Sequence, residues 1–168
     1  GPGADEGRSV APSLRRLPGT PAEIRVLPGL YWRLITEAAG RNFFEDDWKV
    51  APEADRIGYR FRGGRPFSFE PREQPFGAGS DPSNIVDGCY QYGSIQVPGG
   101  SEPIVLHRDA VSGGGYFTLG AVISADMDLI GQLQPHTPTR FVKVDMATAL
   151  TARRDRAALI ARLHDALV

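Results

Sequence analysis

The sequence is poor in sulfur and in net charge, and both shortages exclude classes of protein. Its 168 residues include one cysteine, Cys89, so no intrachain disulfide can form, and the reducing cytoplasm is the expected location. The formal net charge is −1. A basic excess of the kind that attracts nucleic acids and acidic membranes is therefore absent, and neither is expected as a partner.

Long apolar runs and targeting signals are missing too. The longest apolar run, residues 119–123, is far too short to span a bilayer. The chain begins with GPGADEGRSVAPS, whose residues are mostly small or polar. This stretch does not contain the apolar segment that a signal peptide requires. We therefore expect a globular protein, and the length fits one domain with a real hydrophobic core.

Spacings that mark metal and thiol chemistry are also absent. His107, His136 and His164 lie far apart without the spacing of metal ligands, so no metal site is expected. Cys89 can act as a nucleophile only beside a base, and a buried structural thiol is the favoured interpretation. The glycine run at residues 113–115 fits neither a P-loop nor a dinucleotide fingerprint.

Glycine and proline are plentiful, and their 20 and 14 copies indicate many turns and short strands. Residues 1–22 have no apolar periodicity and are predicted to form a flexible N-terminal arm, either mobile or lying along a partner. Residues 23–168 are predicted to form one domain. Its strands are predicted over residues 23–27, 48–51, 57–62, 94–97, 104–107, 116–124 and 139–144.

Three helices are predicted, over residues 30–39, 126–133 and 146–168. The first is expected to end at Gly40, and the second to be capped by Ser124 or Asp126. The apolar stripe of the third comprises Leu150, Leu159, Ile160, Leu163 and Leu167.

The polar residues that stand out lie in residues 81–134, each near a strand end or a turn, where polar groups can converge over a barrel mouth. Glycine N–H groups there can hold a negatively charged oxygen, and the alternative is an ordinary hairpin turn. Asn84 and Asp87 can orient an amide-like acceptor, or else fix the loop as an Asx-turn. The set comprises Asn84, Asp87, Gln96, Asp109, Gly113, Gly114, Gly115 and Tyr116.

Each remaining member of this set also has two interpretations. Asp109 follows an apolar strand, where a carboxylate is either a general base with a raised pKa or a turn residue. Gln96 lies between apolar neighbours and needs a hydrogen-bond partner if it is buried. Tyr116 can offer its hydroxyl group to a ligand, although a tyrosine whose ring packs in the core and whose hydroxyl group reaches solvent is commoner. Arg56 and Arg60 can bind a carboxylate, but a salt-bridged strand face is favoured.

Several spaced motifs between residues 23 and 148 resemble one protein family. PSNIVD at 82–87 is followed by GSIQVPG at 93–99 and SGGGY at 112–116, while IRVLPG at 24–29 and ADRIGYR at 54–60 precede them. In this order they resemble the carboxyltransferase region of urea carboxylases, of allophanate hydrolase subunit 2 and of the C subunit of 5-oxoprolinase. The resemblance covers the C-terminal part of that region.

The resemblance implies a mainly β (α+β) fold, a cyclophilin-like β-barrel with a short internal helix and a C-terminal helix. It also implies a carboxyltransferase-type subunit of a biotin-dependent urea or amide carboxylase, or of a related amidohydrolase complex. Such a carboxyltransferase passes a carboxyl group from carboxybiotin to a urea- or amide-like small molecule. Such a reaction needs a dry pocket, an oxyanion site and a base. Asp109 and Asp87 are the candidate catalytic residues, and Asn84, Gln96, Gly113, Gly114, Gly115 and Tyr116 are the candidate substrate-binding residues.

The motifs also bear on cofactors and partners. The A-M-K-M biotin-attachment motif does not occur, so no covalent biotin is expected, and carboxybiotin would be presented by a biotin carrier protein. Family members carry an additional N-terminal half, so a homo-oligomer or a second subunit supplying that half is the expected partner. Two alternatives stay open: a reused barrel that binds or transforms a small molecule without biotin, and a regulatory interaction module.

Overall fold

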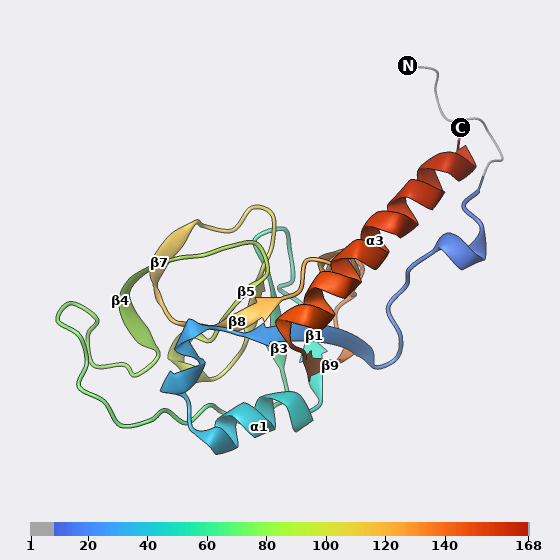
Figure 1. Cartoon of the computed structure of the whole chain (residues 1–168). Helices are drawn as coiled ribbons and strands as arrows, with labels where there is room; N and C mark the ends of the chain where they lie inside the picture. Colours follow the sequence, from blue (N-terminus) through green and yellow to red (C-terminus); the bar gives the residue numbers. More distant parts are fainter. Residues whose placement is uncertain (1–8, 168) are drawn as a thin grey trace.

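Seven short strands close into a barrel in residues 9–167, the part of the chain that this computed structural model describes (Figure 1). Neighbouring strands are antiparallel except β1 and β9, whose parallel pairing closes the barrel. The barrel confirms the prediction of a mainly β fold. In order around the barrel, the strands are β1 (Ala22–Pro28), β8 (Thr118–Val122), β5 (Ser94–Gln96), β6 (Ile104–Leu106), β3 (Gly58–Arg62), β2 (Trp48–Val50) and β9 (Pro138–Lys143).

The barrel interior is filled by side chains from alternate positions of its strands. On β1, Ala22, Ile24 and Val26 are fully buried, whereas the residues between them are more exposed. This alternation is the two-residue period of a strand with one face in the core. The interior is therefore a packed core rather than a channel, and any binding site has to lie at the rim or outside.

The helix predicted over residues 30–39 is wrong in its position. Leu30–Leu34 forms a short 3₁₀ helix, η2, and the α-helix α1 begins later and spans Glu37–Glu45. The two are separated by extended backbone at Ile35 and Thr36, and the Thr36 hydroxyl accepts a hydrogen bond from the Ala39 amide at 3.2 Å. This N-cap starts the helix.

Gly40 lies inside α1 and does not end it, which corrects the second part of that prediction. A Cβ atom at Gly40 would lie 2.8 Å from Cζ2 of Trp32, so glycine is needed here for the close approach of the helix to the indole. Packing, rather than the end of the helix, accounts for this glycine.

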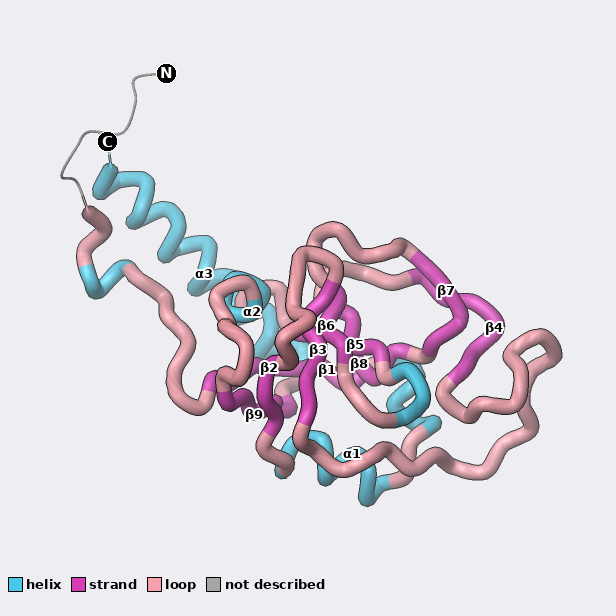
Figure 2. Tube along the Cα trace, turned by 180° about the vertical axis from the view of Figure 1, so that it is seen from behind, coloured by secondary structure: helices cyan, strands magenta, loops and turns pink. Residues whose placement is uncertain are grey.

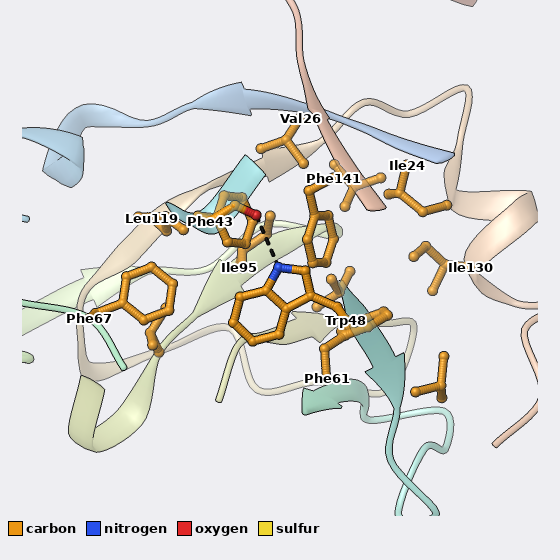
Figure 3. Packing of buried hydrophobic residues seen from close by; sticks show 14 of the residues in the cluster. Ile24, Val26, Phe43, Trp48, Phe61, Phe67, Ile95, Leu119, Ile130 and Phe141 are labelled. Atoms are coloured by element: carbon orange, nitrogen blue, oxygen red, sulfur yellow. Dashed lines mark hydrogen bonds between the residues drawn. The ribbon is translucent and has the colours of Figure 1, made fainter. Parts of the chain in front are cut away.

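An aromatic cluster joins α1 to the barrel core (Figure 3). Phe43 of α1 stacks on Phe141 of β9 with ring centroids 4.6 Å apart. The indole N–H of Trp48 donates to the Phe43 carbonyl oxygen at 3.0 Å, which satisfies a polar group in the core. Phe43, Trp48 and Phe141 are each at most 1% exposed, so α1 is fixed against one side of the barrel.

Two further strands form a separate antiparallel ribbon beside the barrel: β4 (Asn84–Cys89) and β7 (Gly113–Tyr116) (Figure 1). The strand predicted over residues 116–124 is therefore interrupted. Phe117 breaks it, because its fully buried side chain and its bond from the backbone N–H to the Ser83 carbonyl oxygen (3.0 Å) redirect the chain from β7 into β8. The glycine run is a strand, not a turn, and β4 was not predicted.

The remaining helices lie at the opposite side of the barrel from the ribbon (Figures 1 and 2). They are α2 (Met127–Ile130) and α3 (Met146–Leu167). The 3₁₀ turn η3 (Pro98–Gly100) lies instead beside the start of the ribbon, where the Gly99 N–H donates to the Ser83 hydroxyl oxygen at 3.0 Å. The predicted side-chain cap of α2 is not formed. None of the described helices is both long and apolar enough to cross a membrane.

The start of α3 packs on the barrel, and its later turns project away from it (Figure 1). Ala149 and Ala152 are the buried positions, because their small side chains allow a close approach. In the predicted apolar stripe, Leu150 and Ile160 are 42% and 46% exposed. Leu159 and Leu163 are half-buried, and the Leu167 side chain lies outside the described part.

The described part of the N-terminal arm, from residue 9, lies against this chain's own barrel and helices. It contains the 3₁₀ turn η1 (Pro12–Leu14), which contacts α3. Residues 1–8 of the predicted arm are outside the described residues.

Candidate functional site

The largest hollow among the described pockets, about 430 Å³, lies between the β4–β7 ribbon and the barrel wall formed by β1, β5 and β8. We call it the ribbon pocket. Its volume is within the range of small-molecule sites. Its lining residues are Leu27, Pro28, Gly29, Leu30, Tyr31, Ile85, Gly88, Cys89, Tyr90, Gln91, Ser94, Thr118, Gly120, Ala121 and Met146.

Backbone makes one wall of the ribbon pocket. A Cβ atom at Gly120 would lie 2.3 Å from the Leu27 carbonyl oxygen, so only glycine fits where β8 meets the end of β1. Directly beside it, the Gly29 N–H donates to the Leu119 carbonyl oxygen at 2.9 Å. This close pairing holds the turn before η2 against the barrel and places Tyr31 at the pocket.

The ribbon pocket is uncharged: its lining contains no Asp, Glu, His, Lys or Arg. The Ser94 hydroxyl is already used, since it accepts a hydrogen bond from the Gln91 N–H at 3.1 Å. The side chains of Tyr31, Gln91 and Thr118 make no hydrogen bond to other described residues. Their donors and acceptors are available to a neutral polar ligand.

Tyr90 ties the ribbon to the barrel. Its hydroxyl donates to the Tyr116 carbonyl oxygen at 3.0 Å and accepts from the Tyr116 N–H at 2.8 Å. Burial raises the pKa of the Tyr90 phenol, so it stays protonated and keeps both bonds at neutral pH. Tyr90 therefore shapes the pocket, and its own polar group is occupied.

Three of the predicted site residues lie together, but outside the ribbon pocket. Asn84, Gly115 and Tyr116 line a separate hollow of about 340 Å³. The Asn84 amide donates to the Ala78 carbonyl oxygen at 3.1 Å, which holds the loop that precedes β4. The Tyr116 side chain is 43% exposed.

The other two glycines of the run are engaged in the ribbon ladder, where Gly113 pairs with Cys89 and Gly114 with Gly88. A Cβ atom at Gly114 would lie 3.2 Å from the Tyr90 hydroxyl oxygen. Glycine at this position therefore permits the packing of β7 on Tyr90.

Asp109 lies on an exposed edge, and the expectation of a raised pKa is wrong. Arg56 makes two hydrogen bonds to its carboxylate, at 2.7 and 2.9 Å. These bonds lower the pKa of Asp109 below its usual range. The favoured interpretation of the arginines is confirmed, since Arg60 likewise pairs with Glu102 at 3.2 Å.

Gln96 and Asp87 are placed in two further surroundings. Gln96 is buried and lines a third hollow of about 260 Å³ together with Arg60. Asp87 is exposed on β4, and its carboxylate accepts a hydrogen bond from the Gly88 N–H at 2.9 Å. Asp87 itself does not line the ribbon pocket, but it is the predicted acid whose neighbour in the chain, Gly88, does.

Cys89 is exposed and lines the ribbon pocket, so the interpretation as a buried structural thiol is wrong. It lies at the last position of β4, where the ribbon faces solvent. Tyr31, Tyr90, Gln91 and Thr118 were not singled out from sequence. The one available signal was the polar Gln91 between two tyrosines, directly before the turn at Gly93, and this pattern alone does not mark a site.

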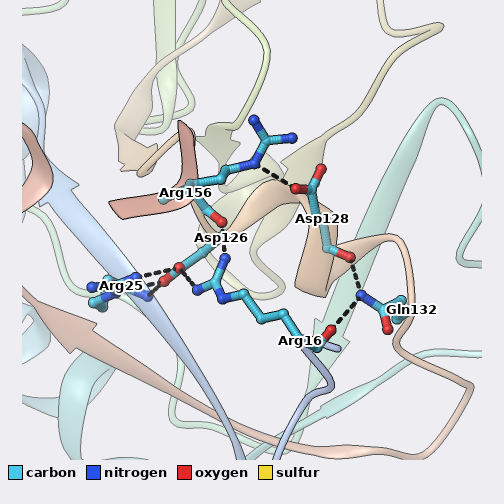
Figure 4. Close-up of polar contacts among 7 residues, drawn as sticks. Arg16, Arg25, Asp126, Asp128, Gln132 and Arg156 are labelled. Carbon is cyan, nitrogen blue, oxygen red and sulfur yellow. Dashed lines mark hydrogen bonds and ion pairs between the residues drawn. The ribbon is translucent and has the colours of Figure 1, made fainter. Parts of the chain in front are cut away.

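A buried ion-pair cluster on another side of the barrel has a structural role (Figure 4). The fully buried Asp126 accepts hydrogen bonds from Arg25 of β1, at 2.6 and 2.9 Å, and from Arg16 of the arm, at 2.5 Å. This engagement explains why Asp126 does not cap α2. Nearby, Arg156 of α3 pairs with Asp128 at 2.5 Å. The cluster joins the arm, β1, α2 and α3.

The uncharged pocket between the closed barrel and its attached ribbon is the candidate small-molecule site of this domain. Comparison with known proteins is more specific. The family model "Carboxyltransferase domain, subdomain A and B" matches residues 2–143, and the chain belongs to this family. The helix α3 begins after the last matched residue.

Individual relatives agree with this assignment. The chain is 32% identical to the C subunit of 5-oxoprolinase from Escherichia coli over 133 residues, which cover 79% of this chain and 39% of that protein. It is 31% identical to the urea amidolyase of Lachancea kluyveri over 123 residues, covering 73% of this chain and 7% of the relative. The chain therefore spans less than half the length of either relative.

A solved structure gives the same answer for the fold. The crystal structure of the Kluyveromyces lactis urea carboxylase superposes with a TM-score of 0.76 at 29% identity. The match covers 87% of this chain and 13% of that enzyme. The chain is thus a carboxyltransferase-type domain related to urea carboxylase and to the C subunit of 5-oxoprolinase.

Proposed function

We propose that this chain is the part of a biotin-dependent carboxyltransferase or related amide-processing complex that holds a urea- or amide-like small molecule in the ribbon pocket. The names of its relatives support this substrate class, since they act on urea or 5-oxoproline. In this proposal, biotin is not attached to the chain. A biotin carrier protein presents carboxybiotin at the pocket.

The observation that carries the proposal is a lining without charged residues, mostly apolar, in which Tyr31, Gln91 and Thr118 supply a few polar groups. A urea or amide is neutral and planar, and it offers both N–H donors and a carbonyl acceptor. The Gln91 amide offers the complementary pair, and the hydroxyl groups of Tyr31 and Thr118 add groups that both donate and accept. A charged substrate head would find no counter-ion there.

We propose Asp87 as the proton acceptor for the attacking nitrogen. This role follows from the position of Asp87 beside Gly88, and from its single hydrogen bond, to the backbone of that neighbour. Asp109 is less suited to this role, because Arg56 already occupies both of its carboxylate oxygens. A positioned base typically contributes about 10² to 10⁴ in rate.

A partner subunit is part of the same proposal. The E. coli relative is itself named a subunit, and the yeast relatives are far longer proteins. Val86 and Tyr116 on the ribbon are 56% and 43% exposed, and Phe76 on the loop before it is fully exposed. Apolar side chains gathered in this way favour a protein contact over the ribbon.

The test is carboxyl transfer by the chain with its partner subunit, a biotin carboxylase, a biotinylated carrier, ATP and radiolabelled bicarbonate. Urea and 5-oxoproline are offered as acceptors. We expect labelled product. Gln91→Leu should raise KM, and Asp87→Asn should lower kcat by about 10² to 10⁴ with little change in melting temperature. Asp165→Asn, an exposed change on α3 remote from the pocket, is the matched control.

Two results would overturn parts of this proposal. If the acceptors bind but no carrier supports transfer, the chain is a reused barrel that binds a small molecule without biotin. If Asp87→Asn and Asp165→Asn leave kcat equally unchanged, Asp87 is not the base.

A further inference from the structure

The ribbon pocket does not end at the barrel wall. A second hollow of about 300 Å³ adjoins it and shares four of its lining residues, Leu27, Gln91, Ala121 and Met146. We call this second space the α3 hollow, because its far wall is the first turns of α3. The two hollows lie side by side, with these four residues at their common boundary, and we call them together the groove.

The middle of this groove is apolar. Met146 lies at the boundary and is 60% exposed, and Leu150, one helical turn later, is 42% exposed. Ala149 between them is buried against the barrel. An aliphatic segment of a ligand would cover the exposed parts of Met146 and Leu150 and remove apolar surface from water.

The far end of the groove carries one cation. Arg153 is the single charged residue among the lining residues of both hollows. It makes no hydrogen bond or ion pair with another described residue, whereas Arg156 on the same helix is paired with Asp128. With no carboxylate in either lining, Arg153 is available to an anionic group.

The wall that α3 contributes to this half of the groove lies outside the family match. The family model ends at residue 143, and Met146, Leu150 and Arg153 all belong to α3. A property that depends on α3 is therefore a property of this chain rather than one carried by the matched region.

We infer that a ligand can pass between the two hollows past Met146 and that the groove selects one elongated substrate. Its amide or urea head lies in the ribbon pocket, its aliphatic chain crosses Met146 and Leu150, and a terminal carboxylate or phosphate pairs with Arg153. This inference rests on the proposed function and names the substrate class.

The helix geometry sets the length of the chain. From Met146 to Arg153 the helix rises about 10 Å, and a long side chain on a helix leans back toward the N-terminus. The anionic group is therefore held about four to eight bonds beyond the head group.

The experiment is calorimetric titration of the full chain with a series of ureido-alkyl carboxylates whose chains contain two to ten methylene groups. Each acid is paired with its neutral carboxamide, and one length is also made as a phosphonate. We expect affinity to be highest at an intermediate length and to fall about three- to tenfold in the carboxamide. The phosphonate arm tells whether the anion is a carboxylate or a phosphate.

The variant Arg153→Gln should remove the difference between acid and carboxamide and leave binding of the short ligands unchanged. Arg154→Gln is the matched control, because this neighbouring exposed arginine lines neither hollow. Helix content and melting temperature should match in the two variants, since both positions are exposed on α3.

The outcomes separate this inference from the proposed function. If short ureas bind and longer acids gain nothing, the α3 hollow is not a subsite, and the proposed function stands. If Arg153→Gln and Arg154→Gln weaken the acids equally, the effect is non-specific charge, and the inference fails. If no member of the series binds, the ribbon pocket is not an amide site, and both proposals fall.

Discussion

Tyr90 uses one hydroxyl group to hold the glycine-rich strand β7. The hydroxyl serves the N–H and the carbonyl oxygen of Tyr116 together, so a single atom secures the end of the ribbon that walls the pocket. The sequence pattern drew attention to Tyr116 and to the glycines. The structure explains both through their contact with Tyr90, whose role depends on a partner 26 residues away.

Tyr90→Phe should lower the free energy of unfolding by about 1 to 3 kcal/mol, because the Tyr116 backbone groups lose their partner while the ring stays in place. Chemical denaturation measures this change. The control is Tyr92→Phe, which removes an exposed hydroxyl that has no hydrogen bond in the described residues and should cost far less. Equal losses in the two variants would contradict this role of the Tyr90 hydroxyl.

Single residues also show where prediction from sequence stops. From residue type alone, Asp109 was a candidate general base and Cys89 a candidate buried thiol. The pKa of Asp109 and the exposure of Cys89 depend instead on their surroundings in the fold. Arg56 lies 53 positions from Asp109 in the chain, and no local pattern joins them. Pocket residues such as Thr118 carry no distinctive spacing at all.

At the scale of elements, the buried carboxylate of Asp126 joins segments that are distant in sequence. Burial acts to raise the pKa of Asp126, but the hydrogen bonds from Arg25 and Arg16 outweigh it and hold the pKa below its usual value. The folded protein therefore binds this proton less readily than the unfolded chain does. The group contributes stability above its unfolded pKa, and this contribution is lost as the pH falls through the folded pKa.

Asp126→Asn should cost about 3 kcal/mol of unfolding free energy at neutral pH, because Arg16 and Arg25 lose their buried partner. The difference from the wild type should stay constant down to about pH 4 and shrink below it. Urea denaturation at a series of pH values measures it. Asp47→Asn, which changes an exposed ion pair, is the control. A difference that persists unchanged at about pH 2 would contradict the assigned ion pairs.

The elements themselves were predictable to different degrees. Strands with strict alternation, such as β1, could be read from sequence because one face is in the core. The position of helix α1 was predicted wrongly because it depends on two contacts that do not appear in the spacing of apolar residues. Thr36 caps the start of the helix, and the close approach of Trp32 requires a glycine at position 40. The ribbon was missed because a glycine strand has no side chains to form a pattern.

At the scale of the whole molecule, the barrel and its family were accessible from sequence, whereas the positions of its hollows were not. The predicted cleft required its polar residues to converge over one mouth. They are distributed instead among two hollows, the ladder of the ribbon and an exposed edge. The antiparallel pairing of β1 with β8 brings Leu27 and Gly29 beside β8, and the ribbon then encloses the pocket.

The central claim is that the ribbon pocket binds a neutral amide or urea, and nuclear magnetic resonance of the ¹⁵N-labelled chain tests it most directly. Titration with urea at non-denaturing concentration should shift the backbone amide signals of Gly88, Gln91 and Thr118. The signals of Asp109 and Asp165, which are remote from the pocket, should stay in place. Shifts confined to the surroundings of Gln96 or of Asn84 and Tyr116, or no shifts at all, would contradict the claim.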